Sequence, residues 1–480
     1  MTDIFEEEAA RAAAWEAETA AEYDRIHEAQ DLTVGEQHRG QARIAYRFAN
    51  RYRHRLMYVN GLGWRVWDGK RWAADQKGAT TTAVLDVLRA ALADSISDHD
   101  LRLDVRKSES ANGIDGVLRI ASALPGIRVG VDELDADPYL INCANGTLDL
   151  RTREVRPHDP ADRITRVARG AYAPTEKSRD WLDFLAQILP DDEERAYLQR
   201  VAGQAIYGAV REHLFPILTG TGANGKGTAY GALVHALGDY GIVIDPNMLL
   251  GGGKKGGPDP ELLQLMGARL VVGSETEEGQ RLDAAKMKRL TGGDQMTTRG
   301  LYSDPVTWKP SHQILYVTNH MPEVNANDPA VWRRIRVIPF DVVIPPHERD
   351  GKLPDRLELA ADAILTWAVE GWFAYEDNGG MGTPESVTRA TSGYRDDSDD
   401  VKQFIEDECF TGDELFASAS DLFSAWSKWA SQNGAKTNDQ KWFAKELKRL
   451  GYTSGRSSKG VRWRGVAVPA WHVHNPPKAA

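Results

Sequence analysis

The sequence predicts an α/β fold in which a mostly parallel sheet is flanked by helices. Three observations lead to this prediction. Apolar runs alternate with helical patterns between residues 212 and 345, a glycine-rich loop follows the first of these runs, and regions of different composition lie on both sides. Alternating strands and helices favour a parallel sheet, because each crossover helix returns the chain to the same edge. We therefore expect a central α/β domain between two smaller domains.

Composition divides the chain into four segments. We expect an acidic helical arm, an α+β N-terminal domain, the α/β core and a basic C-terminal domain, at residues 1–35, 36–200, 201–385 and 395–480 respectively. Pro384 and the acidic run 396–400 indicate a linker ahead of the last domain. Aromatic and polar residues alternate around an Asp-Gly pair and predict a β-hairpin over 63–72, and a second hairpin is expected near 145–150.

Charge and cysteine content narrow the class of protein. The 480 residues carry a net charge of -11, and 41% of them are hydrophobic, as in an ordinary folded chain. The two cysteines, Cys143 and Cys409, lie far apart, which excludes a disulfide scaffold and a cysteine-based zinc ribbon. The acidic N-terminus lacks the apolar core of a signal peptide, and no apolar run approaches a membrane span. We expect a cytoplasmic protein without a membrane partner.

A phosphate-binding loop follows the apolar run 214–219 and opens a helix. Its glycines let successive backbone N–H groups turn toward a phosphate chain, and Lys226 would place its ammonium on the β- and γ-phosphates. Gly227 stands where Ser or Thr is usual, with Thr228 one residue later. The magnesium ion is then either reached through Thr228 or held through water, so its direct ligand stays open. The expected nucleotide-binding residues are Gly220, Gly222, Asn224, Gly225, Lys226, Gly227 and Thr228.

Polar residues at the ends of two further strands suit nucleotide hydrolysis. Glu275 and Glu277 follow the apolar run 270–273. Hydrolysis needs one carboxylate on the metal ion and one near the attacking water. Which glutamate takes which role is open, and Glu275 is taken as the metal ligand. Asn319 ends the run 314–318, where an amide can orient the water and sense the γ-phosphate.

An arginine pair precedes the last expected strand of the core, the run 335–340. Arg333 and Arg334 are the two residues. An arginine supplied by a neighbouring copy can stabilise the charge that develops on the γ-phosphate during hydrolysis. Taken alone, the pair is more typical of a charged surface.

A phosphate loop alone fits several classes of protein. Gly-Lys-Gly-Thr also occurs in nucleoside monophosphate kinases, and an initiator that uses ATP only to assemble would carry the same loop. The two glutamates, Asn319 and the basic C-terminal segment argue against the kinase. Replacing both Glu275 and Glu277 by Gln would separate the remaining two classes. A motor should then bind DNA and stall, whereas an initiator should keep its function.

In order and spacing, the motifs resemble those of the phage and plasmid primase C-terminal helicases, relatives of the poxvirus primase-helicase within superfamily 3 of the AAA+ ATPases. The resemblance extends over about residues 40–470. Five motifs carry it: Gly-x-Gly-x-Asn-Gly-Lys at 220–226, Val-Val-Gly-Ser-Glu-Thr-Glu-Glu-Gly at 271–279, Lys-Arg-Leu-Thr-Gly-Gly-Asp at 288–294, Thr-Asn-His-Met-Pro at 318–322 and Trp-Arg-Arg at 332–334.

The resemblance implies an AAA+ type P-loop ATPase core and an ATP-dependent replicative DNA helicase of a phage or mobile element. It implies ATP and Mg2+ at the loop, and a homohexameric ring that moves on single-stranded or forked DNA, because each ATP site is shared between neighbours. Carried over to this chain, the catalytic residues are Lys226, Glu275, Glu277, Asn319 and either Arg333 or Arg334, the last acting on a neighbouring subunit.

The resemblance further implies a hairpin that contacts DNA in the pore of the ring. Contacts are expected at Lys288, Arg299, Tyr302 and Lys309. The charged residues would bind phosphate, and Tyr302 with Trp308 would stack on bases. Ordinary packing within the hairpin explains the two aromatic residues equally well.

Members of the family often carry a primase ahead of the helicase. Here about 200 residues precede the loop, and they resemble the helicase-associated N-terminal domain. The acidic pairs Asp98-x-Asp100 and Asp135-x-Asp137 lack a strand-and-His framework, so we expect solvated loops there rather than a metal site. The chain is expected to work with a separate primase and other replication proteins.

The C-terminal domain differs from the rest in charge. From residue 435 onward the Lys and Arg residues outnumber the acidic ones to give a net charge of about +8, a patch typical of phosphate-backbone binding. Helices over 418–431 and 439–450, followed by a strand pair around 460–468, predict a winged-helix-like domain. Such a domain would hold duplex, origin or a partner protein.

Overall fold

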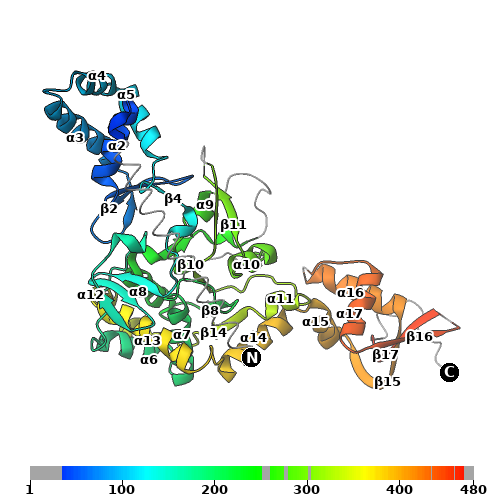
Figure 1. Ribbon diagram of the computed structural model, residues 1–480. Helices are drawn as coiled ribbons and strands as arrows, with labels where there is room; N and C mark the ends of the chain where they lie inside the picture. Colours follow the sequence, from blue (N-terminus) through cyan, green and yellow to red (C-terminus); the bar gives the residue numbers. More distant parts are fainter. Residues whose placement is uncertain are drawn as a thin grey trace, which may run out of the picture.

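The computed structural model describes residues 35–250, 260–274, 279–300, 304–433, 435–458 and 460–469. Figure 1 shows three parts: a helical head, a central body built on a sheet, and a C-terminal domain that projects from the body. Glu275, Glu277 and Tyr302 lie outside the described residues, as does the expected acidic arm apart from residue 35.

The head packs four helices against a small sheet in the order β3-β2-β1-β4. Ile44 and Phe48 are fully buried at its centre. The expected hairpin over 63–72 is confirmed, because Trp67 pairs with Trp72 in antiparallel strands. The elements are η1 (Gly35–Gln37), α2 (Gln41–Tyr52), β1 (Leu56–Val59), β2 (Gly63–Trp67), β3 (Trp72–Ala74), α3 (Ala79–Asp94), α4 (His99–Ser108), α5 (Ala111–Ala121) and β4 (Arg128–Val129).

The residues that follow the head belong to the body. Trp181 is buried in the same hydrophobic cluster as Leu218 of the central sheet. Residues from Leu140 onward therefore pack with the sheet, so the second part of the expected N-terminal domain 36–200 shares the core of the body. The hairpin expected near 145–150 is present. The elements are η2 (Val131–Glu133), β5 (Leu140–Cys143), β6 (Gly146–Asp149), β7 (Glu154–Arg156), η3 (Pro160–Asp162), α6 (Arg179–Ile188) and α7 (Asp192–Gln204).

Five parallel strands form the central sheet, in the order β14-β8-β13-β10-β9. The expected parallel sheet is thus confirmed, and four of its strands are the predicted apolar runs. The edge strand β9 has no counterpart among them. The strands are β8 (Phe215–Thr219), β9 (Gly241–Ile244), β10 (Leu270–Ser274), β13 (Gln313–Thr318) and β14 (Ile335–Pro339).

Helices and a two-stranded hairpin complete the body. In the hairpin, Met296 pairs with Trp308 and Arg299 with Pro305. The elements are α8 (Lys226–Leu237), η4 (Gly238–Tyr240), η5 (Pro246–Met248), α9 (Pro260–Leu263), α10 (Ala284–Leu290), β11 (Met296–Arg299), β12 (Pro305–Trp308), α11 (Pro329–Trp332), η6 (Pro346–Glu348), α12 (Leu353–Leu359) and α13 (Ala361–Asp377).

Many helices begin where a side-chain oxygen accepts a hydrogen bond from the first turn, which satisfies backbone N–H groups that have no partner within the helix. The residues that act in this way are Asp98, Ser110, Ser178, Asp191, Asp283, Asp328, Asp399, Ser418 and Asp439. These caps fix where several helices of all three parts start.

The expected linker around residue 390 is instead a helix, α14 (Glu385–Asp397). Thr391 accepts a hydrogen bond from the backbone N–H of Val337 at 2.9 Å. The buried Tyr394 donates its hydroxyl to the carbonyl of Pro322. The helix therefore packs on the edge strand β14 and belongs to the body. The acidic run that suggested a linker forms its last turn and the cap of the next helix.

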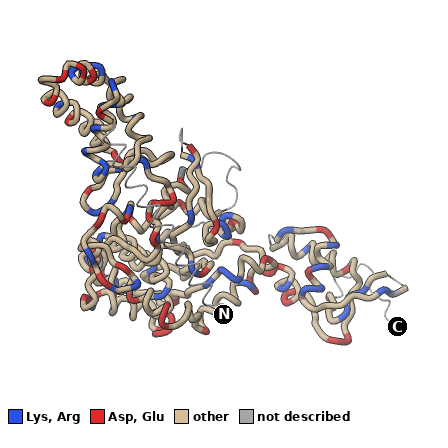
Figure 2. The backbone as a smooth tube through the Cα atoms, in the orientation of Figure 1, with Lys and Arg blue, Asp and Glu red and all other residues tan. Residues whose placement is uncertain are grey.

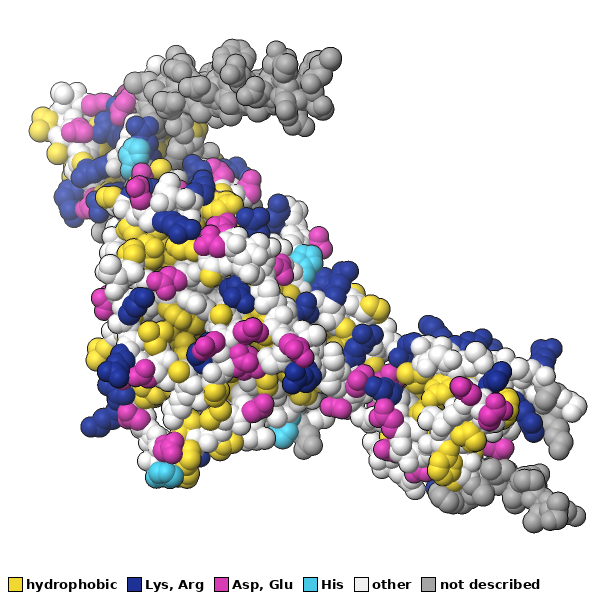
Figure 3. All heavy atoms as spheres, turned by 90° about the horizontal axis from the view of Figure 1, so that it is seen from below, with side chains coloured by type: hydrophobic (Ala, Val, Ile, Leu, Met, Phe, Trp, Pro, Cys, Tyr) yellow, Lys and Arg dark blue, Asp and Glu magenta, His cyan; other side chains and the backbone are white. Residues whose placement is uncertain are grey.

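The C-terminal domain has its own hydrophobic core, with Phe404, Trp426 and Phe443 fully buried. The two expected helices and the strand pair are present, together with a further helix and strand. Figure 2 shows Lys and Arg recurring through this domain, and Figure 3 shows them along one edge of its lobe. The elements are α15 (Asp400–Glu408), β15 (Phe410–Ser418), α16 (Ala419–Gln432), α17 (Gln440–Arg449), β16 (Thr453–Ser457) and β17 (Gly460–Ala467).

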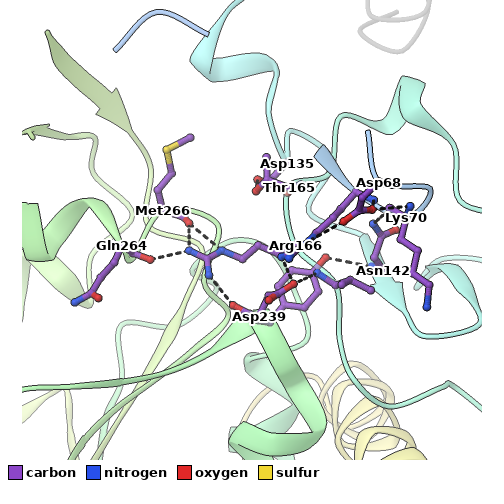
Figure 4. Close-up of polar contacts among 12 residues, drawn as sticks. Asp68, Lys70, Asp135, Asn142, Thr165, Arg166, Asp239, Gln264 and Met266 are labelled. Atoms are coloured by element: carbon purple, nitrogen blue, oxygen red, sulfur yellow. Dashed lines mark hydrogen bonds and ion pairs between the residues drawn. The ribbon is translucent and has the colours of Figure 1, made fainter. Parts of the chain in front are cut away.

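A polar junction ties the N-terminal half to the edge of the central sheet (Figure 4). The guanidinium of Arg166 donates to the carbonyls of Asp239, Gln264 and Met266 at 2.6 to 3.1 Å. The carboxylate of Asp239 pairs with Arg71 of the head. These contacts fix the head relative to the sheet.

The acidic pairs of the N-terminal region are partly exposed to solvent and also make specific contacts. Asp98 caps α4 and pairs with Arg43 at 2.8 Å. Asp135 accepts hydrogen bonds from the N–H and hydroxyl of Thr165 at 2.9 and 2.6 Å.

Among the helices of the described residues, none combines the length and the apolar composition that a membrane span requires.

Candidate nucleotide-binding site

The phosphate loop joins strand β8, which lies between β14 and β13, to helix α8 at the carboxyl edge of the sheet. Gly225 has φ +79° at the start of α8, a left-handed conformation that favours glycine. A Cβ on Gly220 would lie 2.4 Å from the carbonyl oxygen of Phe340, so only glycine fits this close approach. Asn224 is buried and donates its amide to the same carbonyl at 3.1 Å. The loop is thus held against the strand that ends beside it.

Lys226 points back across the loop. Its Nζ donates to the carbonyl of Gly220 at 2.9 Å and to the Oδ1 atoms of Asn224 and Asn319 at 3.1 Å each. All three acceptors are neutral oxygens, and the side chain is buried. Desolvation lowers the pKa of Lys226 to about 8. The site therefore holds a poorly solvated cation that a phosphate group would stabilise.

Asn319 reaches this cation because of the strand register. Thr318 pairs with Thr219 across the parallel strands β13 and β8, so Asn319 and Gly220 leave the sheet side by side. The amide of Asn319 is exposed. In the same sheet, Ser274 at the end of β10 pairs with Val317. Glu275 and Glu277 come next in sequence and lie outside the described residues.

The first turn of α8 contains the two residues on which the expected magnesium contact depends. A Cβ on Gly227 would meet no atom within 4 Å, so that position is open. Thr228 is half-buried one residue further along. Gly222, with φ +99°, is similarly unobstructed. The loop thus leaves open space on the side where its backbone N–H groups begin helix α8.

The two arginines of the pair have different surroundings. Arg334 is buried and donates to the carbonyl of Ala330 at 2.7 Å and to Thr291 Oγ1 at 3.2 Å. Burial lowers its pKa. Arg333 is exposed at the C-terminal end of α11, where its backbone N–H bonds to Pro329. Arg334 is therefore engaged within its own chain, whereas Arg333 faces outward.

The residues expected to contact DNA also differ in their surroundings. Arg299 is exposed at the end of strand β11, and Lys309 is exposed directly after strand β12. Trp308 is buried and donates Nε1–H to Thr298 at 3.0 Å, so it packs within the hairpin rather than on its surface. Lys288 on α10 forms an ion pair with Asp328 at 2.5 Å. Tyr302 lies outside the described residues.

A polar groove of about 990 Å³ separates the body from the C-terminal domain. Thr219 and Pro339, at the ends of two core strands, line one side, and Trp442 and Lys445 of α17 line the other. Asn327 bridges the two parts by donating to Glu446 at 2.7 Å. Sequence reasoning did not identify Asn327 or Asp328, although Asp-Pro at 328–329 is readable as a helix N-terminus.

Part of the chain matches a family model, and longer stretches of it are similar to viral proteins. Residues 45–190 match a family model described as D5 N terminal like. The chain is 28% identical over 323 residues to "Putative helicase L207/L206" of Acanthamoeba polyphaga mimivirus, a match that covers 62% of this chain and 34% of that protein. It is 24% identical over 229 residues to "Putative primase C962R" of African swine fever virus, covering 46% of this chain and 24% of that protein.

The matched region spans about a third or less of the length of these two curated relatives. Among solved structures, the C-terminal region of NrS-1 is 11% identical with a TM-score of 0.39, covering 69% of this chain and 84% of that one.

Proposed function

From its place in the D5-like primase-helicase family, we propose that this chain is an ATP-dependent replicative DNA helicase. It binds and hydrolyses ATP at the phosphate loop and moves on single-stranded or forked DNA as a homohexameric ring. Its core is of the AAA+ type, and it serves the replication of a phage or another mobile element together with a separate primase.

The observation that carries this proposal is the environment of Lys226. Its buried ammonium has only neutral oxygen acceptors among the described residues. A buried cation without an anion is unfavourable, and a phosphate group at the start of α8 would relieve that cost. The residues therefore fit a nucleoside triphosphate whose β- and γ-phosphates lie on Lys226.

The residues present also fit a magnesium ion beside those phosphates. Thr228 offers a hydroxyl on the first turn of α8, next to the open position of Gly227. A magnesium ion held there would neutralise charge that develops on the phosphate oxygens. Glu275 is proposed as a further ligand and Glu277 as the residue near the attacking water. Asn319, which contacts Lys226, is proposed to orient that water.

The proposed ring places Arg333 in the site of a neighbouring subunit. Arg333 is exposed at the end of a short, capped helix, so its guanidinium can reach a second copy of the chain. Arg334 bonds to Ala330 and Thr291 within its own chain, which favours Arg333 for this role. A heterologous contact of this kind repeats around a closed ring.

The proposed DNA contacts lie on two elements. Arg299 and Lys309 of the β11–β12 hairpin are proposed to contact the DNA strand along which the ring moves. Tyr302, which falls between β11 and β12 in the sequence, is proposed as a further contact. The C-terminal domain, with a helix pair followed by a hairpin, is proposed as a winged helix that holds duplex DNA through α17. The basic residues of α17 would contact the phosphate backbone.

The test is the rate of ATP hydrolysis by the wild type and Lys226→Ala, with and without single-stranded DNA, over a series of salt concentrations. We expect DNA to stimulate a rate that depends on Lys226, and rising salt to abolish the stimulation, since phosphate contacts release counterions. Unwinding of a forked substrate should depend on the same lysine.

A rate that is indifferent to DNA would refute the helicase, and turnover of nucleoside monophosphates without DNA would favour a kinase instead. Glu275→Gln combined with Glu277→Gln supplies the control for an initiator. If the double variant still assembles at the origin, and the wild type does not unwind DNA, ATP serves assembly and not movement.

A further inference from the structure

Lys288 and Asp328 connect two short helices of the body, α10 and α11. Lys288 lies in the last turn of α10, and Asp328 is the N-cap of α11. The Nζ of Lys288 is 2.5 Å from Oδ2 of Asp328, and both side chains are about two-thirds buried or more. The ion pair holds the pKa of the Asp328 carboxyl below its usual range.

The second oxygen of Asp328 determines where α11 begins. Its Oδ1 accepts hydrogen bonds from the backbone N–H groups of Ala330 and Val331 at 3.1 and 3.3 Å. Helix α11 is only four residues long, and Arg333 immediately follows it. One carboxylate therefore binds Lys288 and also orients the helix that presents Arg333.

A second bond joins the same two helices on the other side of Arg333. Arg334 donates its Nε–H to Thr291 Oγ1 at 3.2 Å, and Thr291 caps the end of α10. Five residues beyond Thr291 the chain enters β11, the first strand of the hairpin. The hairpin is therefore joined to α10 by a short link, and two contacts join α10 to α11 and the residues that follow it.

We propose that the Lys288–Asp328 ion pair couples the β11–β12 hairpin to Arg333. Lys288 is then a positioning residue and not a DNA contact, which replaces the role that the motif pattern suggested for it. The inference rests on the proposed function, because Arg333 acts on the neighbouring ATP site. When DNA shifts the hairpin, the pair carries the shift to α11 and brings Arg333 toward the γ-phosphate.

The structure offers a substitution that separates the pair from the helix cap. Asp328→Asn keeps an N-cap oxygen, since Asn caps helices as well as Asp does, but removes the charge that Lys288 needs. Lys288→Met removes the other partner and keeps the aliphatic stem. Asp283→Asn is the matched control, because Asp283 caps α10 through Ala285 and Lys286 without an ion pair among the described residues.

Steady-state ATP hydrolysis of the full chain is measured at saturating and at zero single-stranded DNA, and DNA affinity is measured over a salt series. We expect Lys288→Met and Asp328→Asn each to lower the DNA-stimulated kcat about tenfold, with the KM for ATP and the salt dependence of DNA binding unchanged. The double variant should be no worse than either single one, because they break the same contact. Asp283→Asn should behave as wild type.

Two outcomes would overturn the inference. If Lys288→Met weakens DNA binding and reduces its salt slope while Asp328→Asn is normal, Lys288 contacts phosphate directly. If DNA stimulates the wild type and all variants reach the same stimulated kcat, the ion pair does not couple the hairpin to Arg333. A wild type that DNA does not stimulate would instead overturn the proposed function, and this inference with it.

Discussion

The ammonium of Lys226 donates a hydrogen bond of 3.1 Å to the side-chain amide oxygen of Asn319, although the two residues are 93 positions apart in sequence. They meet because β8 and β13 are adjacent parallel strands whose carboxyl ends lie at the same edge. Under the proposed function, both side chains would contact the γ-phosphate. The contact joins the expected phosphate-binding lysine and the expected sensor in one cluster.

ATP affinity should depend on pH above neutrality. Burial lowers the pKa of Lys226 to about 8 in the chain without nucleotide, whereas a bound phosphate favours the charged form and raises that pKa. Binding therefore takes up a proton at higher pH. The dissociation constant for ATP should rise by about tenfold per pH unit above 8, until the pKa of the complex is reached. Titration of a fluorescent ATP analogue between pH 7 and 9.5 measures this.

Lys226→Arg is the control for that titration, because a guanidinium stays protonated throughout the range. Its affinity for ATP should be weaker than that of the wild type but nearly independent of pH. A flat profile in the wild type would contradict the assignment of the pH effect to Lys226.

Two glycines of the phosphate loop should differ sharply in their tolerance of alanine. In Gly220→Ala the new Cβ would lie 2.4 Å from the carbonyl of Phe340 and 2.2 Å from the Asn224 amide. The loop must shift, so ATP binding should weaken at least tenfold and stability should fall by about 1–3 kcal/mol. In Gly227→Ala the Cβ meets nothing within 4 Å, and both properties should stay close to wild type. Calorimetric titration and thermal unfolding of the two variants provide the comparison.

The parts of the molecule that the sequence predicted are those with a local signal. Apolar runs bounded by glycine or polar residues marked β8, β10, β13 and β14, because buried parallel strands are hydrophobic on both faces. The Asp-Gly pair marked the hairpin of the head. The phosphate loop was readable because its chemistry lies in consecutive residues.

Features that depend on distant partners could not be predicted. Strand β9 has a half-exposed pattern, with Val243 51% exposed, so it lacks the continuous apolar run of its neighbours. Helix α14 follows a proline and ends in acidic residues, which is also the composition of a linker. Arg269 is fully buried only because carbonyls of Ile206 and Leu140 surround it, at 2.7 and 2.8 Å. Which of Arg333 and Arg334 is buried likewise depends on the surrounding packing.

Alanine at Arg333 and at Arg334 should have opposite consequences. Arg334→Ala removes a buried side chain that bonds Ala330 and Thr291, so it should destabilise the body by about 2–4 kcal/mol. Arg333→Ala removes an exposed side chain and should leave the melting temperature within about 1 °C of wild type. Its ATP hydrolysis should nevertheless fall by about 10³-fold, as for other arginines that act in trans. Thermal unfolding and steady-state hydrolysis distinguish the two cases.

A mixing experiment then tests whether Arg333 acts on a neighbour. Arg333→Ala and Lys226→Ala are each expected to be inactive as pure proteins. Mixed subunits would create interfaces that contain one intact lysine and one intact arginine, so activity should reappear on mixing. An inactive mixture that still assembles would show that the arginine and the lysine serve the same subunit.

The lysines of α17 should govern binding of duplex DNA. Lys441, Lys445 and Lys448 are exposed and spaced by four and three residues, which places them on one face of the helix. Replacing all three by Gln keeps helix propensity but removes three cations. If each contacts a phosphate, the slope of log affinity against log salt should become shallower by about 2.7. A matched variant with Lys107, Lys177 and Lys352 changed to Gln, all exposed outside this domain, should keep the wild-type slope. Equal slopes in the two variants would place the duplex elsewhere on the molecule.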